Sequence, residues 1–153
     1  MQLSCDNEIV HLIMMSNTYQ STAEELIRKE GGRATEGRVR ILALLLAEEQ
    51  AITHREIEER LPGQQPDRVT LYRVLQWLAD RGLIHKITSD DRVWRFHVNH
   101  AAYSRQHAHF KCTKCAKVVC LEDLPSGRHM TLPTGYQFQT IELTVKGLCA
   151  QCV

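Results

Sequence analysis

The chain has 153 residues, of which 43% are hydrophobic and 24% are charged, and its formal net charge is +1. This composition predicts an ordinary soluble chain of one domain or two small ones, and the nearly neutral total gives no support to nucleic-acid binding, which must be argued from the local placement of charges. The longest purely apolar run, 41–47, is too short to cross a bilayer, so we expect no membrane segment. The first sixteen residues contain two acidic residues but no lysine or arginine, unlike a secretory signal, which predicts a cytoplasmic location.

The first predicted elements are a leader and two helices. Residues 1–20 show little periodicity and are expected to form a flexible leader. Residues Thr22–Glu30 are typical of a short helix that ends at the glycines 31 and 32. A longer helix follows Thr35, its expected N-cap, and extends to about Glu49 because apolar side chains recur there at helical spacing. These side chains are Val39, Leu42, Leu45 and Leu46.

Two further helices are predicted next. Residues Ile52–Leu61 favour a compact helix, because Thr53 and Glu56 have the spacing of a capping box. The second of these, which is the third helix when the short one at Thr22–Glu30 is left out of the count, is expected over Arg68–Arg81 and ends before Gly82. It has one apolar face, made of Leu71, Val74, Leu75 and Leu78.

A hairpin follows the third helix. Residues Leu83–Ile87 and Arg92–Val98 are typical of two strands around a turn at 88–91. The order of three helices and a hairpin predicts a winged helix-turn-helix domain over residues 21–98, whose third helix enters the major groove of DNA. Local positive charge that the total conceals is expected on this domain, at Arg68, Arg73, Lys86, Arg92 and Arg95.

The remainder of the chain predicts a hinge and a second domain. Residues 99–106 are expected to form the hinge, and residues 107–153 the domain. Within it, Lys117–Cys120 and Tyr136–Val145 are typical of strands. We therefore expect an α+β chain, in which a winged helix-turn-helix domain precedes a small C-terminal α/β domain, and a sheet this small favours a dimer partner.

Two Cys-x-x-Cys pairs dominate the second domain: Cys112 with Cys115, and Cys149 with Cys152. Each turn directs two sulfurs to one point, so the two pairs supply the tetrahedral four-sulfur shell that a structural zinc ion prefers. Disulfides are one alternative, but nothing else in the sequence indicates an oxidising compartment. A thioredoxin-like redox pair is another, but that chemistry uses a single pair at the start of a helix.

A second metal site is indicated by histidines. Four of the eight fall within thirteen residues, at His97, His100, His107 and His109. Neutral imidazoles are good ligands for zinc, iron, nickel or copper. Further candidate ligands are Cys120, Glu122 and Asp123. A thiolate at Cys120 would favour zinc over iron, although this cysteine is equally interpreted as a small buried hydrophobe. The isolated histidines are expected at the surface, namely His11, His54, His85 and His129.

Three stretches resemble the ferric uptake regulator family of metal-dependent bacterial repressors. They are the recognition-helix sequence Val69–Leu75, the His-x-His and Cys-x-x-Cys run His107–Cys115, and the closing Gly147–Cys152. The resemblance covers about residues 33–153. It implies a homodimer with an N-terminal DNA-binding domain, a C-terminal dimerisation domain and a regulatory metal at the hinge.

The resemblance also implies roles for particular residues. Tyr72 and Arg73 would contact DNA from the recognition helix with Thr70 beside them, while Arg38 would hold a phosphate and Arg33 would reach the minor groove. His107 and His109 match the paired hinge ligands of the family, with His97 or His100 as the third ligand. The sequence departs from the family pattern at Ala51, Gln106 and Ala108, where some members place metal ligands.

The function that we expect is a metal-dependent, DNA-binding transcriptional repressor of metal uptake genes and not an enzyme. Its cofactors would be a structural Zn²⁺ and a second, regulatory divalent metal, Zn²⁺ or Fe²⁺, and its partners a double-stranded DNA operator and a second copy of the chain. A zinc-ribbon metalloenzyme or thiol redox protein is the alternative from another class; it would need an open zinc position with Glu122 or Asp123 as base. A peroxide-sensing repressor with iron among the histidines is a subtype.

Overall fold

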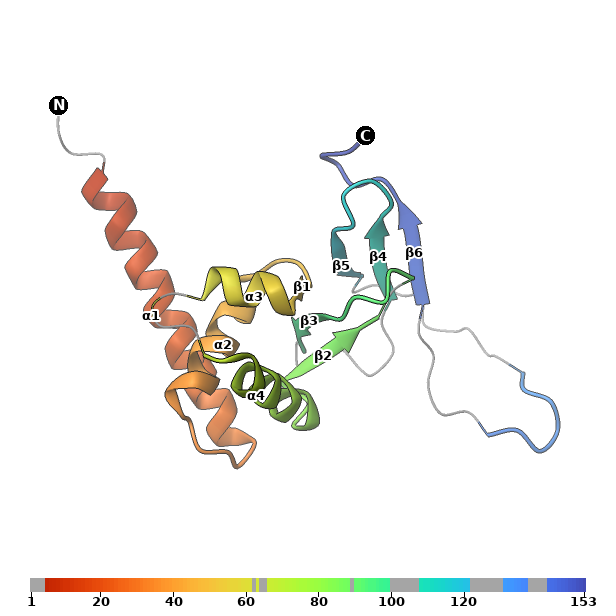
Figure 1. Ribbon diagram of the computed structural model, residues 1–153, viewed down its shortest axis with the longest axis horizontal. Helices are drawn as coiled ribbons and strands as arrows, with labels where there is room; N and C mark the ends of the chain where they lie inside the picture. Colours follow the sequence, from red (N-terminus) through yellow and green to blue (C-terminus); the bar gives the residue numbers. More distant parts are fainter. Residues whose placement is uncertain are drawn as a thin grey trace. The chain divides into compact units, whose positions relative to one another are not determined.

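The computed structural model describes residues 5–61, 63, 66–88, 90–99, 108–121, 131–137 and 143–153, with side chains from residue 17 onward. The chain divides into two compact units, Met1–Asn99 and His100–Val153 (Figure 1). The division falls at the beginning of the segment 99–106 that the sequence analysis assigns to a hinge. Each unit is described below by itself.

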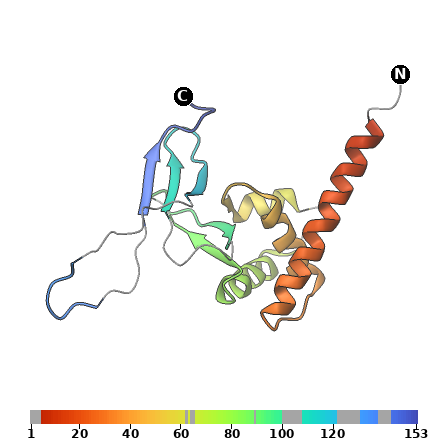
Figure 2. The ribbon, with the colours of Figure 1, turned by 180° about the vertical axis from the view of Figure 1, so that it is seen from behind.

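The first unit has the winged helix-turn-helix architecture that the sequence predicts. Its elements are α1 (Cys5–Lys29), α2 (Glu36–Ala47), β1 (Ile52–Thr53), α3 (His54–Arg60), α4 (Arg68–Asp80), β2 (Ile84–Ile87) and β3 (Arg95–Val98). The strands form an antiparallel sheet in the order β1-β3-β2. The view from behind in Figure 2 shows the long helix α1 on one side of this unit. Helix α4 and the hairpin β2-β3 are the parts that a winged helix presents to DNA.

Local signals start the two central helices. The predicted capping box of α3 is confirmed: Thr53 Oγ1 accepts a 3.2 Å hydrogen bond from the backbone N–H of Glu56, and the Thr53 N–H donates to the Glu56 carboxylate at 2.7 Å. Helix α4 is capped by Asp67, whose carboxylate accepts hydrogen bonds from the backbone N–H groups of Val69 and Thr70, both at 3.0 Å. Such caps satisfy backbone donors that a helix N-terminus leaves without an intrahelical partner.

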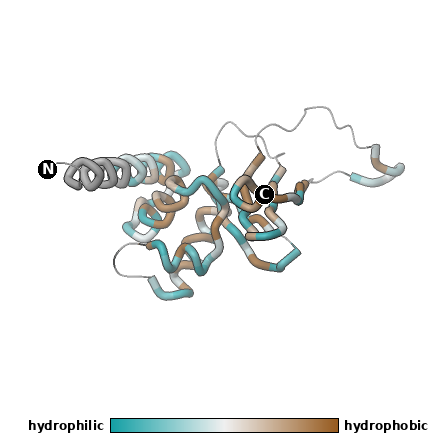
Figure 3. Tube along the Cα trace, turned by 90° about the horizontal axis from the view of Figure 1, so that it is seen from above, coloured by the Kyte–Doolittle hydropathy of each residue, from teal (hydrophilic) through white to brown (hydrophobic). Residues whose placement is uncertain are grey.

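The core of the first unit lies where the helices and the sheet meet. Figure 3 shows the alternation of apolar and polar residues along these elements. Its fully buried large side chains come from every helix: Ile27 of α1, Ile41, Leu42 and Leu45 of α2, Ile57 of α3, and Leu71, Leu75 and Leu78 of α4. Burial of each such side chain contributes about 1.5–3 kcal/mol, so this cluster holds α4 in place while the opposite face of that helix remains exposed.

The first helix is longer than predicted. The sequence analysis begins it at Thr22 after a flexible leader, whereas α1 begins at Cys5. The physical reason is that no glycine or proline occurs before Gly31, so nothing in the sequence stops a helix there. Its C-terminal part is tied to the core by Ala23 and Ile27, which are both fully buried.

The second unit contains one three-stranded sheet in its described part. The strands are β4 (Ala108–Cys112), β5 (Val118–Leu121) and β6 (Leu143–Gly147), in the order β5-β4-β6. Strand β5 is antiparallel to β4 and β6 is parallel to it. The central strand β4 was not predicted, and the strand expected over Tyr136–Val145 was placed wrongly: residues 136–137 are not in a strand and β6 continues beyond Val145. Residues 138–142 lie outside the described residues.

None of the helices in the described part of the chain combines the length and the apolar character that crossing a membrane requires.

Candidate metal centres and DNA-binding surface

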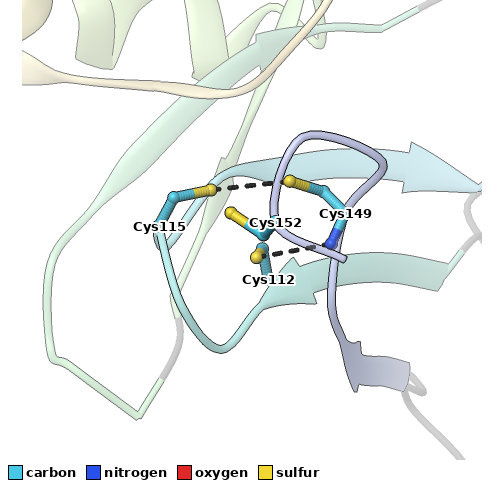
Figure 4. Close-up of side chains that lie close together, drawn as sticks. All are labelled: Cys112, Cys115, Cys149 and Cys152. Carbon is cyan, nitrogen blue, oxygen red and sulfur yellow. Dashed lines mark hydrogen bonds between the residues drawn. The ribbon is translucent and has the colours of Figure 1, made fainter.

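Strand pairing brings the two Cys-x-x-Cys turns together. Strand β4 ends at Cys112, and the parallel pairing of β4 with β6 places Cys112 opposite Gly147, two residues before Cys149. The turn after β4 is closed by a hydrogen bond from the Ala116 N–H to the Cys112 carbonyl at 3.0 Å, with Ala116 at a positive φ of 61°. The sheet therefore delivers both turns to the same end of the unit (Figure 4).

The four sulfurs have the spacing of a zinc site. All four lie within 4.8 Å of one another, and the Cys115 and Cys149 sulfurs are 3.7 Å apart. A tetrahedral shell with zinc–sulfur bonds of about 2.3 Å places sulfurs about 3.8 Å apart, whereas a disulfide requires about 2.05 Å. Figure 4 shows the side chains of Cys112, Cys115, Cys149 and Cys152 converging on a common point. The cluster fits the structural zinc that the sequence predicts, and it does not fit a pair of disulfides.

The backbone prepares one of these thiols to bind metal. Backbone N–H groups of Cys115 and Cys149 lower the pKa of Cys112 to about 6, and the Cys149 N–H lies 3.4 Å from the Cys112 sulfur. The hydrogen bond with the Cys149 side chain, together with burial, raises the pKa of Cys152 to about 12. Since the thiolate is the form that binds metal, Cys112 is the ligand that is most readily ionised, and zinc must displace the proton of Cys152.

A pair of histidines lies on the hairpin of the first unit. His85 of β2 is opposite His97 of β3 in the antiparallel register, so both side chains are on the same face of the sheet. Their ring centroids are 5.9 Å apart, and one ring nitrogen of each lies within 4.8 Å of the other. His97 is buried, with 6% of its surface exposed. The sequence analysis expected His85 at the surface and did not group it with His97, although the predicted hairpin contains the signal that pairs them.

The second unit has a comparable pair. His109 of β4 is opposite Cys120 of β5 in the antiparallel register. Both side chains are partly buried, and an imidazole and a thiol share one face of this sheet. The other predicted ligands of the regulatory metal lie outside the described residues: His100, His107, Glu122 and Asp123.

The predicted recognition helix presents an exposed face. Tyr72 has 56% of its surface exposed, and Thr70 and Arg73 beside it are also exposed. Thr70 is constrained, because its hydroxyl donates a 2.6 Å hydrogen bond to the carboxylate of Asp67. The phenol and the guanidinium thus lie off the face of α4 that carries the buried leucines, as the predicted contacts with DNA require.

Arg38 and Arg33 lie at the start of the α2 region. The Arg38 guanidinium lies 3.8 Å from the centroid of the Trp77 ring and donates a 3.0 Å hydrogen bond to the Arg33 carbonyl. Arg33 is exposed. A stacked arginine loses little conformational freedom when it binds a phosphate, so this arrangement suits the predicted backbone contact.

The hairpin places two predicted cations differently. Lys86 donates a 2.7 Å hydrogen bond to Gln76, and its ammonium lies 5.7 Å from the Tyr72 ring centroid and 5.3 Å from that of Trp94. Arg95 is only 7% exposed and forms a 2.8 Å ion pair with Asp91. The prediction that Arg95 contributes to the local positive charge is therefore wrong, because the folded hairpin buries its guanidinium against the carboxylate of Asp91, which offsets its charge.

A winged-helix unit followed by a small sheet with a four-cysteine cluster defines a regulator that binds DNA and holds metal. The model of the ferric uptake regulator family matches residues 29–146, and the chain belongs to that family. It is accordingly a metal-responsive transcription regulator and not an enzyme.

Three individual relatives illustrate the similarity. The zinc uptake regulation protein of Escherichia coli K12 is 26% identical over 136 residues, which cover 86% of this chain and 79% of the relative. The ferric uptake regulation protein of Haemophilus ducreyi is 30% identical over 106 residues, covering 65% of this chain and 68% of that protein. Among solved structures, a zinc uptake regulator complexed with zinc and DNA has a TM-score of 0.66 at 22% identity, over 89% of this chain and 93% of that one.

Proposed function

We propose that the protein is a homodimeric, cytoplasmic repressor that binds a double-stranded DNA operator when a regulatory divalent metal is bound. The observation that carries this proposal is the occurrence of two cross-strand pairs of metal-binding side chains, His85 with His97 and His109 with Cys120, in addition to the four-cysteine cluster. Four cysteines close a structural site completely, so a sensing metal needs a separate set of ligands.

The regulatory metal takes its ligands from these pairs and from the hinge histidines His100 and His107. Zn²⁺ is the first choice and Fe²⁺ the second, because a thiolate at Cys120 together with imidazoles favours zinc. The relative from Escherichia coli, by its name a zinc uptake regulation protein, supports the same choice. Metal that links the DNA-binding unit to the dimerising unit restricts the positions available to α4, and metal binding and operator binding are then thermodynamically linked.

The DNA-binding half of the proposal rests on α4 and its surroundings. Tyr72 and Arg73 contact base edges or phosphates in the major groove, with Thr70 beside them, while Arg38 contacts a phosphate and Arg33 enters the minor groove. A homodimer presents two copies of α4 to two half-sites about one helical turn apart.

The dimerisation half rests on the second unit. Strand β6 is at the edge of its small sheet, and the apolar side chains of Val145 and, just after the strand, Leu148 are 43% and 50% exposed. Exposed apolar side chains beside the edge strand of the described sheet favour association with a second copy.

The test combines element-resolved metal content with DNA binding. The wild-type protein is expected to contain two zinc ions per chain, of which mild chelation removes one and abolishes operator binding. The variants His85→Ala, His97→Ala and Cys120→Ser should each lose the removable ion and keep the other. His54→Ala is the matched control, because His54 is the first residue of α3, lies 3.7 Å from Glu58 and belongs to neither cross-strand pair, so it should change neither quantity.

Two results would contradict the proposal. One is a single, unremovable zinc ion with operator affinity that chelation does not change. The other is a removable ion that persists in all three ligand variants, which would place the sensing metal elsewhere. Mass gain on histidine after peroxide treatment of the iron-loaded protein would identify the peroxide-sensing subtype.

A further inference from the structure

Asn99 connects the hairpin of the first unit to the end of the recognition helix. It directly follows β3, and its backbone N–H donates a 2.9 Å hydrogen bond to the Leu83 carbonyl. Its side-chain amide nitrogen donates a 2.8 Å hydrogen bond to the carbonyl of Gly82, two residues after the end of α4. A backbone carbonyl can only accept, so this contact fixes which end of the Asn99 amide is nitrogen and which is oxygen.

The other end of the same amide faces a histidine. The side-chain oxygen of Asn99 lies 2.6 Å from Nδ1 of His85. Since that oxygen can only accept, the proton of the hydrogen bond must be on Nδ1 of His85. In a neutral imidazole with the proton on Nδ1, the lone pair that can bind a metal is on Nε2.

We propose that Asn99 is a positioning residue of the regulatory metal site, which holds His85 in the tautomer that offers Nε2 to the metal. The inference rests on the proposed function, in which His85 is a ligand. Hydrogen bonds from the second nitrogen of a ligand histidine orient the ring and raise its basicity, and their loss typically lowers metal affinity by about 10- to 100-fold. His97 supplies the neighbouring imidazole, with one of its ring nitrogens within 4.8 Å of one of His85.

The two hydrogen bonds of Asn99 also couple the proposed metal ligand to the end of α4. One side chain contacts both the proposed ligand His85 and the Gly82 carbonyl, where the positive φ of 70° ends the helix and turns the chain into β2. If the His85 ring moves when metal binds, the Asn99 side chain moves with it and displaces the residues that follow α4. Asn99 thus lies between the metal and the element that contacts DNA.

The first measurement is made on the wild-type protein. The sample is the protein with zinc in its four-cysteine site and with the removable metal taken out. The histidine ring nitrogens are observed by ¹⁵N NMR at mildly alkaline pH, because an ordinary imidazole is neutral there. The spectrum of His85→Gln identifies the signals of His85. We expect the proton of the His85 ring on Nδ1 and none on Nε2, and a proton on Nε2 would overturn the inference.

Two substitutions separate the hydrogen bond from packing. Asn99→Leu removes the acceptor and should lower the affinity for Zn²⁺, measured by competition with a chelating dye, by about 10- to 100-fold. Asn99→Asp keeps an acceptor for His85 but loses the donor to the Gly82 carbonyl, so it should keep the tautomer and an affinity closer to that of wild type than that of Asn99→Leu. Asn17→Leu is the control, because Asn17 is an exposed asparagine on α1.

The outcomes distinguish this inference from the proposed function. If Asn99→Leu binds Zn²⁺ as tightly as wild type while His85→Ala binds it more weakly, Asn99 has no positioning role but the site stands. If His85→Ala and His97→Ala leave Zn²⁺ affinity unchanged, the proposed site itself is wrong, whatever the tautomer. Should Asn99→Leu fail to fold, the wild-type spectrum and the Asn99→Asp affinity decide the inference.

Discussion

The guanidinium of Arg38 on α2 lies 3.8 Å from the ring centroid of Trp77 on α4, so a cation stacked on an indole joins the two helices. Arg81 lies 5.2 Å from the centroid of the same ring and donates a hydrogen bond to the carbonyl of Glu30. The side chain that is predicted to contact a phosphate is therefore held by α4, the predicted recognition helix. Any change that displaces the Trp77 ring should disturb both the position of the Arg38 guanidinium and that of α4.

Substitution of Gly32 should displace that ring. A Cβ atom at this position would lie 2.3 Å from Cη2 and 2.5 Å from Cζ2 of Trp77, much closer than van der Waals contact. We expect Gly32→Ala to lower the free energy of unfolding by about 1–3 kcal/mol and to weaken operator binding. Urea denaturation and a DNA titration measure the two effects.

Gly37→Ala is the matched control for this prediction. Gly37 lies in α2, and a Cβ there meets nothing within 4 Å. The free energy of unfolding should be unchanged or should rise by up to about 1 kcal/mol, because alanine favours a helix over glycine. Equal stability of the two variants would show that Gly32 has no packing role against Trp77.

Two arginines on the DNA-binding unit should respond differently to salt. Arg73 is exposed on α4, and its replacement by glutamine should reduce the slope of log affinity against log salt concentration by about one, because one phosphate contact is lost. Arg95→Gln should leave that slope unchanged and lower the free energy of unfolding by about 1–3 kcal/mol, since it breaks the ion pair with the partly exposed Asp91. A reduced slope for Arg95→Gln would place its guanidinium at the DNA.

Two cysteines should differ in their effect on folding. Cys112→Ser should remove the tightly bound zinc and unfold the second unit, because the binding energy of a structural zinc is folding energy. Cys120→Ser should retain that zinc and the sheet, and lose only the removable ion. Metal content and circular dichroism on the same samples test this; equal zinc content in Cys112→Ser and wild type would mean that the four-cysteine cluster is not the structural site.

The fourth prediction concerns the backbone at Ala116. Its φ of 61° is in the left-handed region, which costs an L-residue about 1–2 kcal/mol relative to glycine. We expect Ala116→Gly to raise the free energy of unfolding of the zinc-loaded protein by roughly 0.5–1 kcal/mol, after the greater freedom of glycine in the unfolded chain is subtracted.

The control for Ala116→Gly is Ala150→Gly. Ala150 is in the second Cys-x-x-Cys turn without a positive φ, so glycine there should lower stability by a few tenths of a kcal/mol to about 1 kcal/mol. Thermal unfolding under identical zinc concentrations compares the two. A loss of stability in both variants would argue against backbone strain at Ala116.

Local signals in the sequence were sufficient for much of the first unit. The capping box at Thr53 and Glu56 and the apolar face of α4 depend on residues three or four apart, so they were predicted and are present. Strand β4 was missed because it contains no regular alternation: Ala108, Lys111 and Cys112 are buried. Its identity depends on pairing with β6, more than thirty residues later, which no local pattern reveals.

In the candidate sites, too, the features set by local sequence were predicted and those set by strand pairing were not. The four cysteines were found from spacing alone, because the Cys-x-x-Cys turn itself orients two sulfurs. His85 was missed because twelve residues separate it from His97 and only the register of the hairpin makes them neighbours. Arg95 was counted as local positive charge because the sequence does not show that the folded hairpin buries it in an ion pair with Asp91, four residues earlier.

Strand β4 carries His109 near one end and Cys112 at the other, three residues or about 10 Å apart. The position of His109 opposite Cys120 requires β4 and β5 to be paired, and a zinc ion held by Cys112 and the three cysteines beside it would stabilise that pairing. On the proposed function, the two metals therefore bind in a fixed order. Each newly made chain must bind one structural zinc ion before it can respond to a second. Synthesis of the regulator therefore lowers the concentration of free zinc to which the regulator responds.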